Sequence, residues 1–242
     1  MIATERSDDI KDFIDFLERI VGQEVARDRA GADPREIERL TALARLPLPP
    51  LYLEYLREFG ANDGIVKLSD DASSKPEALI DYYLEQADSE ESEIPPNMVI
   101  VGVNGSSGER ALLYSDEARK GTEEPSVVVS WWGEVDYTLA LSFRNFLYRK
   151  VFANARLKRG TTLQLQKNDG NLVPSIRRAT LELGFQPYWF SDDCQTCLER
   201  EDDSALLART WGESVSVYGS FADSKIRDEV KLALMQRLDL TE

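Results

Sequence analysis

The residues best suited to chemistry in this chain of 242 residues are Cys194 and Cys197, which are separated by two residues. This C-x-x-C spacing is typical of thiol oxidoreductases, in which nearby positive charge stabilises a reactive thiolate. Here the flanking charges are mostly acidic and disfavour a thiolate: Asp192, Asp193, Glu199, Glu201, Asp202 and Asp203, against the single cation Arg200. A thiol-dependent enzyme that uses the two cysteines is therefore the least favoured function of the chain.

Metal and nucleophile chemistry that depends on histidine is excluded, because the chain contains no histidine. Zinc sites with histidine ligands and nucleophiles activated by a histidine base both fall under this exclusion. The chain has only two cysteines, so it cannot supply four thiolates to a zinc ion. In a strand, a spacing of three residues would also place the two thiols on opposite faces. We therefore predict no catalytic residue, no metal and no cofactor.

The chain is strongly acidic, with 44 aspartate and glutamate residues against 29 lysine and arginine residues, a net charge of −15. A surface of that sign repels phosphate backbones and attracts basic partners, so we expect no direct binding of nucleic acid. No stretch of the sequence approaches the roughly 20 apolar residues that span a bilayer, and the first residues lack a signal-peptide core. We therefore expect a cytoplasmic protein that does not bind membranes.

Acidic residues are concentrated between residues 69 and 93, where Lys75 is the only cation. Runs of like charge are commonly just solvated surface, and that interpretation stays open here. A basic cleft, such as that of a nuclease, would instead be attracted to such a patch and could be covered by it. We predict that five carboxylates form part of an electrostatic partner surface: Asp70, Asp71, Glu90, Glu91 and Glu93.

Two consecutive tryptophans, Trp131 and Trp132, end an expected strand just before Gly133. Alternation along a strand would point one indole inward and the other outward. Tryptophan is enriched at binding hot spots, so either residue could anchor an interface. Packing in the core or between domains is the alternative, and it is the more common use of such a side chain.

The elements that position these residues predict an α+β fold. Amphipathic periodicity, prolines and capping residues predict helices over 10–21, 34–45, 50–59, 76–87, 143–159, 174–183 and 224–238. Apolar or alternating runs, β-branched in the first of them, predict strands over 98–103, 110–114, 127–131, 162–166 and 187–191. Two or three further strands are expected after residue 191, among them 215–219. From this order we divide the chain into an N-terminal helical extension (1–32), a first α+β domain (33–159) and a second small α+β domain (160–242).

A run without acidic residues extends from Tyr137 to Lys167 and covers the helix expected over 143–159. It contains Arg144, Arg149, Lys150, Arg156, Lys158 and Arg159. These cations could form the solvated side of an amphipathic helix, or they could pair with acidic residues of the second domain. Binding of nucleic acid by this helix is the least favoured of the three interpretations.

Three segments carry a family resemblance through their order and spacing. The first is the helix of residues 34–45 followed by Leu46-Pro47-Leu48-Pro49-Pro50-Leu51-Tyr52-Leu53-Glu54-Tyr55-Leu56-Arg57-Glu58-Phe59-Gly60. The second is the turn Asn62-Asp63-Gly64, and the third is Ser142-Phe143-Arg144-Asn145-Phe146-Leu147. Together they make residues 36–147 resemble the SUKH superfamily, which includes the Smi/Knr-type yeast regulators and many bacterial immunity proteins.

This resemblance implies a binding protein with a SUKH-like antiparallel or mixed sheet flanked by helices. Bacterial members are commonly immunity proteins that bind and neutralise toxins, often nucleases, and other members act as interaction modules. The family has no catalytic signature, so the resemblance assigns no site residue to this chain. With the acidity, it leads us to expect a non-catalytic protein that neutralises a basic toxin domain. The alternative is a regulatory or scaffold protein without a toxin partner.

Overall fold

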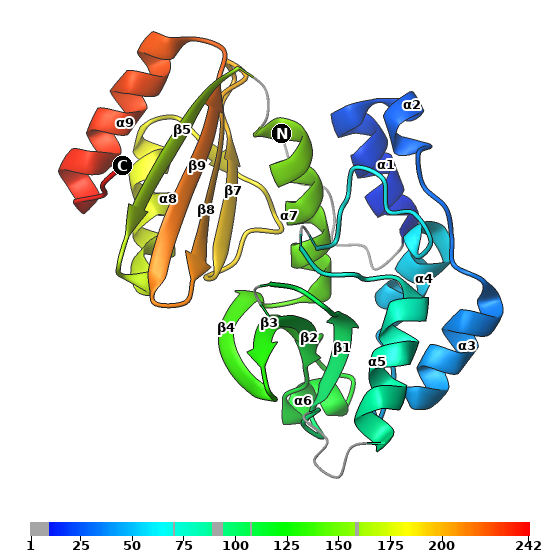
Figure 1. Cartoon of the computed structure of the whole chain (residues 1–242). Helices are drawn as coiled ribbons and strands as arrows, with labels where there is room; N and C mark the ends of the chain where they lie inside the picture. The colour runs from blue at the N-terminus through cyan, green and yellow to red at the C-terminus, as the bar shows by residue number, and fades with distance from the viewer. Residues whose placement is uncertain (1–9, 70, 89–93, 107, 158–159) are drawn as a thin grey trace.

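The structure, a computed structural model, describes residues 10–69, 71–88, 94–106, 108–157 and 160–242. In these ranges the chain is an α+β protein with nine α-helices and two antiparallel sheets, which confirms the predicted fold class (Figure 1). None of the helices described is both long enough and apolar enough to cross a membrane.

Five helices precede the first sheet: α1 (Ile10–Val21), α2 (Gln23–Ala26), α3 (Pro34–Leu43), α4 (Pro50–Phe59) and α5 (Pro76–Asp88). Their ends follow local signals in the sequence. The carboxylate of Asp33 accepts a hydrogen bond from the backbone N–H of Arg35 and caps α3, whose first residue is a proline. Gly60 follows the last residue of α4, as predicted.

The first sheet has the strand order β1-β2-β3-β4. Its elements are β1 (Met98–Gly102), β2 (Glu109–Leu113), the short helix α6 (Asp116–Arg119), β3 (Ser126–Trp131) and β4 (Glu134–Ala140). The first three strands confirm the prediction, but β4 was not predicted. Its first three residues are all exposed and its pairing with β3 is bulged, so the alternation that identifies a strand is missing there.

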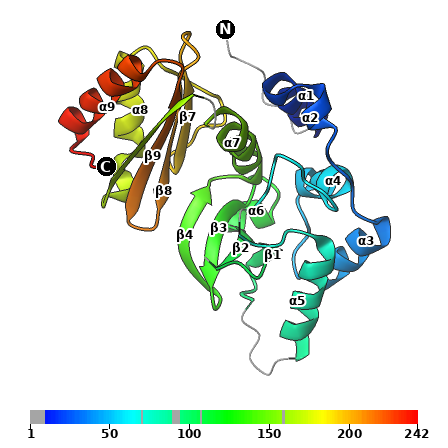
Figure 2. The same ribbon diagram turned by 45° about the horizontal axis from the view of Figure 1, so that its top comes forward.

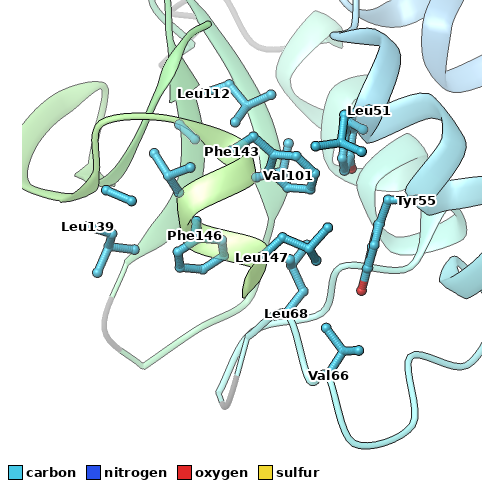
Figure 3. Close-up of a cluster of buried hydrophobic side chains, with 14 of the residues drawn as sticks. Leu51, Tyr55, Val66, Leu68, Val101, Leu112, Leu139, Phe143, Phe146 and Leu147 are labelled. Atoms are coloured by element: carbon cyan, nitrogen blue, oxygen red, sulfur yellow. The ribbon is translucent and has the colours of Figure 1, made fainter. Parts of the chain in front are cut away.

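Helix α7 (Phe143–Arg156) lies between the two sheets (Figures 1 and 2). It begins at Ser142, whose hydroxyl accepts a hydrogen bond from the backbone N–H of Asn145 at 3.1 Å. Figure 3 shows apolar side chains of α7 packed with those of α4, the loop after α4 and the first sheet: Leu51, Tyr55, Val66, Leu68, Val101, Leu112, Leu139, Phe143, Phe146 and Leu147. Two of the segments that resemble the SUKH superfamily therefore supply core residues: Leu51 and Tyr55 from the first, and Phe143, Phe146 and Leu147 from the third.

The second sheet has the order β5-β9-β8-β7-β6. Its elements are β5 (Thr161–Lys167), α8 (Val173–Glu182), β6 (Gln186–Pro187), β7 (Gln195–Glu199), β8 (Ala205–Trp211), β9 (Ser214–Phe221) and α9 (Ser224–Leu238). Helices α8 and α9 cover one face of this sheet (Figure 1). The strand predicted over 187–191 is wrong beyond Pro187, because the chain turns where Ser191 donates its backbone N–H to the carbonyl of Tyr188.

The larger apolar core crosses the predicted boundary between the two domains. It contains side chains of α1, α4, the first sheet and α7, and also Tyr188, Phe190, Cys197, Ala205 and Leu207 from the second half of the chain. Phe16 of α1 and Phe190 lie with their ring centroids 5.6 Å apart. The second sheet is therefore apolar on both faces, with α8 and α9 on one side and this shared core on the other. The division at residue 160 stays a prediction.

Candidate functional site

The tip of the hairpin formed by β3 and β4 carries a strained tryptophan. Trp131 and Glu134 close the hairpin, and Trp132 and Gly133 form its two-residue turn with φ angles of 46° and 80°. Positive φ at both positions is the type I′ geometry, which favours Asn-Gly. A tryptophan held in this left-handed region costs about 1–3 kcal/mol. The side chain held at this cost is 75% exposed.

The two indoles lie in different environments, as predicted: Trp132 is exposed and Trp131 is half-buried. Trp131 packs against Gly108, where an added Cβ would lie 3.0 Å from the indole. The two rings are still neighbours, with centroids 5.7 Å apart. Trp131 therefore packs beside the exposed Trp132, and the interface role predicted for either residue stays a prediction.

A further tryptophan, Trp211, lies beside this hairpin although it is 79 residues later than Trp132 in the chain. It ends β8, and Gly212 in the following turn has φ 59°. The Trp211 ring lies 5.3 Å from the ring of Tyr137 on β4. Trp211 is 43% exposed, so the two hairpins present their tryptophans on neighbouring surfaces. Both hairpins contain the tripeptide Trp-Gly-Glu, at 132–134 and 211–213.

We call Trp131, Trp132, Val135 and Trp211 the tryptophan surface. A shallow pocket of about 440 Å³ joins the first three of these residues. Three exposed carboxylates border the apolar side chains: Glu134, Asp136 and Glu213. No ion pair within the described chain involves these three residues. Exposed aromatic groups inside an acidic border suit a partner that is both apolar and basic.

Of the five carboxylates predicted to form an acidic partner surface, Asp71 is the one that lies within the described residues. Asp71 forms an ion pair with Arg110 at 3.0 Å and accepts hydrogen bonds from the hydroxyls of Ser69 and Ser106. Asp70, Glu90, Glu91 and Glu93 lie outside the described residues, so their part of the prediction stays a prediction. The acidic border of the tryptophan surface was not predicted.

The basic residues of α7 that the structure describes point into the protein. Arg144, Arg149, Lys150 and Arg156 are all buried. Arg156 forms ion pairs with Glu199 and, at 2.7 Å, with Asp203, both on the second half of the chain. For Arg156 this confirms the alternative in which the helix pairs with acidic residues of the second domain. The interpretation of these side chains as a solvated face is wrong.

The two cysteines lie in the β7 region in an environment that keeps both thiols protonated. Burial, reinforced by Asp192 and Asp193, raises the pKa of Cys194 to about 11. Cys197 is fully buried, and that burial raises its pKa further. Among the described residues no cluster of cysteine, aspartate and glutamate could hold a metal ion. The arrangement lacks the stabilised thiolate that a thiol enzyme requires.

We expect the alkylation of the native protein by iodoacetamide to be slow at pH 7 and to occur at Cys194 rather than Cys197. The rate should rise about tenfold per pH unit toward pH 11, because only the thiolate reacts and Cys194 has a pKa of about 11. Peptide mass spectrometry after timed alkylation measures both rates, and the protein unfolded in urea is the control. A rate that levels off near neutral pH would contradict the assignment and restore the thiol-enzyme hypothesis.

Sequence reasoning identified Trp131 and Trp132 but missed Val135, Trp211 and the acidic border. The repeated Trp-Gly-Glu tripeptide was the available signal, since it marks two hairpin turns: Trp132 lies in the first turn, and Trp211 is the last strand residue before the second. No protein-family model matches this chain, and no curated protein matches it either. The function must therefore be argued from the geometry of the site.

Proposed function

We propose that this chain is a non-catalytic protein-binding module that captures a basic partner protein through the tryptophan surface. The observation that carries the proposal is Trp132, which is 75% exposed at a turn position with φ 46°. A large apolar side chain there gains little from burial and strains its own backbone. Strain of this kind persists at functional sites, where it presents a side chain to a partner.

The neighbours of Trp132 support the same function. Tryptophan dominates binding hot spots because it buries a large rigid surface, and less energetic contacts around it exclude water. Trp131 and Val135 border the same shallow pocket as Trp132, and Trp211 extends the apolar area on the second hairpin. The cluster therefore provides Trp132 as the central hot-spot residue and, around it, apolar contacts that exclude water. These residues come from two hairpins that the shared apolar core holds together.

Charge supports a basic partner. Glu134, Asp136 and Glu213 border the anchor, and the whole chain carries −15. A negative field accelerates encounter with a positive surface and disfavours acidic competitors. A toxin domain that binds nucleic acid needs a basic cleft, so it fits this requirement. The more specific proposal is therefore an immunity protein of the kind that the SUKH resemblance suggests.

Replacing Trp132 by asparagine tests the proposal, because it should change binding and stability in opposite directions. The substitution places an asparagine directly before Gly133, which is the favoured type I′ pair, so the free energy of unfolding should rise by about 1 kcal/mol. Loss of the anchor should weaken the complex with the partner by about 30-fold or more. The partner to test is the protein encoded beside this chain's gene, co-expressed with it, purified and titrated by calorimetry.

The matched control is Leu232→Asn, which removes an exposed apolar side chain on α9 instead. We expect this control to bind the partner with unchanged affinity. Equal affinity of Trp132→Asn and the wild-type chain would contradict the tryptophan surface as the binding site. Absence of any complex with the neighbouring protein would contradict the immunity function.

A further inference from the structure

The shallow pocket of the tryptophan surface combines two kinds of group that attract a cation. Its volume is about 440 Å³, and it is lined by Trp131, Trp132, Glu134, Val135 and Asp136. An indole ring attracts a cation through its negative face, and a carboxylate attracts it by its charge. All five residues belong to the hairpin of β3 and β4, so one turn of the chain brings the rings and the carboxylates together.

The two rings are arranged so that a cation can reach them. Trp132 is exposed, and its ring makes an angle of 46° with the ring of Trp131. The rings are therefore tilted and do not cover each other by stacking face to face. Trp131 is half-buried and packs against Gly108, so it forms the fixed wall of the pocket.

The carboxylates of the pocket are exposed, and within the described ranges neither Glu134 nor Asp136 takes part in an ion pair. Glu134 is paired with Trp131 directly across the hairpin. Residues paired in this way have Cβ atoms about 4.5–5.5 Å apart. A cation that lies over these rings is therefore within reach of the Glu134 carboxylate, and Asp136 adds to the negative field.

The second hairpin with the tripeptide Trp-Gly-Glu already holds a guanidinium group. Arg209 lies over the ring of Trp211, with its guanidinium carbon 5.1 Å from the ring centroid. In the part of the chain that the structure describes, no arginine or lysine lies over Trp131 or Trp132 in this way. A cation that binds to the first hairpin therefore comes from another molecule.

We infer that this pocket binds the guanidinium group of an arginine side chain that the partner protein presents. The inference rests on the proposed function, because it names the chemical group that the tryptophan surface captures. A guanidinium is flat, so it can stack on an indole while its N–H groups donate to a carboxylate beside the ring. A lysine ammonium is a compact, strongly hydrated charge that lacks this planar fit.

The test is a titration of the whole chain with N-acetyl-arginine amide, followed by nuclear magnetic resonance at the indole N–H groups of Trp131 and Trp132. We expect saturable shifts with a Kd of about 10 mM or lower. The corresponding citrulline amide has nearly the same shape without the charge, so it should bind more weakly. Nα-acetyl-lysine amide should also bind more weakly, because its ammonium does not stack on the indole.

Two variants test the residues of the pocket. Glu134→Gln keeps the size of the side chain and removes its charge, so the affinity for the arginine amide should fall about two- to fivefold. Trp132→Asn removes the exposed ring and should cause a loss of about the same size. Glu229→Gln on α9 is the matched control, because it makes the same change of charge at an exposed position outside the pocket. It should keep the affinity of the wild-type chain.

Absence of saturable shifts would overturn the inference, as would equal affinity for the arginine amide and either the citrulline or the lysine amide. Unchanged affinity in Glu134→Gln or in Trp132→Asn would also overturn it. The proposed function fails in a different way, through unchanged partner binding in Trp132→Asn. If the arginine amide does not bind but Trp132→Asn still weakens the complex with the partner, capture by the tryptophan surface stands and only the guanidinium site is lost.

Discussion

Replacing Phe190 by alanine is expected to lower the free energy of unfolding by about 3–5 kcal/mol and to destabilise both sheets together. Phe190 belongs to the second half of the chain and is fully buried. Its ring lies 5.6 Å from Phe16 of α1 and 5.5 Å from Tyr148 of α7. Truncation would leave a cavity at the point where α1, α7 and the second sheet meet. Both halves of the protein lose contacts there, so neither should keep its stability.

Urea unfolding followed by two probes measures this effect. Far-ultraviolet circular dichroism reports on both sheets and the helices, and tryptophan fluorescence reports on Trp131 and Trp132 in the first sheet as well as on Trp189 and Trp211. We expect the two transitions to coincide in the wild-type chain and to shift together in Phe190→Ala. Leu181→Ala, at an exposed position on α8, is the control and should change stability by less than about 0.5 kcal/mol. Two separate transitions, with only one of them shifted, would show that the halves fold independently.

The helices could be predicted from the sequence because their signals are local. Asp33 followed by a proline, and Gly60 after an apolar stripe, fix helix ends through bonds within a few residues. The first hairpin was predictable for a similar reason, since a β-branched run and a second apolar run flank a turn rich in glycine. These signals do not depend on what the rest of the chain does.

The errors arise where distant contacts decide the structure. Strand β4 begins with Glu134, Val135 and Asp136, which are exposed and give no alternating pattern, yet pairing with β3 makes them a strand. Residues 188–191 have the apolar composition of a strand, but Tyr188 and Phe190 are used to fill the core beside α1 and α7. A single sequence does not reveal which helix or sheet an aromatic side chain will pack against.

The candidate sites also divide into residues that have a local sequence signal and residues that only the tertiary fold brings together. Trp131 and Trp132 could be selected as candidates from the sequence, because tryptophan is rare and these two are adjacent. The repeated tripeptide marks Trp211 in the sequence, but its position beside this hairpin follows only from the packing of β8 against β4. The burial of the α7 cations was even harder to predict, because their charges resemble a solvated face until the second sheet is packed against the helix. Burial of Arg149 is a property of the tertiary fold and not of its segment.

The tryptophan surface depends on a junction between the two halves of the chain, and Asp192 is the centre of that junction. Its carboxylate accepts hydrogen bonds from the backbone N–H of Leu141, at the end of β4, and from the amide of Asn145 on α7. It also accepts from the backbone N–H groups of Cys194 and Gln195, which lead into β7. One buried carboxylate thus ties the strand that carries Val135 and Tyr137 to the sheet that carries Trp211.

Asp192→Asn is therefore expected to lower the free energy of unfolding by about 3 kcal/mol and to weaken partner binding as well. The substitution removes the charge from four hydrogen bonds and turns an amide group toward donors. Asp193→Asn is the matched control, because the neighbouring carboxylate is exposed and the change of charge is the same. Urea unfolding measures the stability, and near-ultraviolet circular dichroism reports whether Trp211 keeps its contact with Tyr137. Equal stability of the two variants would mean that the junction is held by apolar packing alone, and the tryptophan surface would then not depend on Asp192.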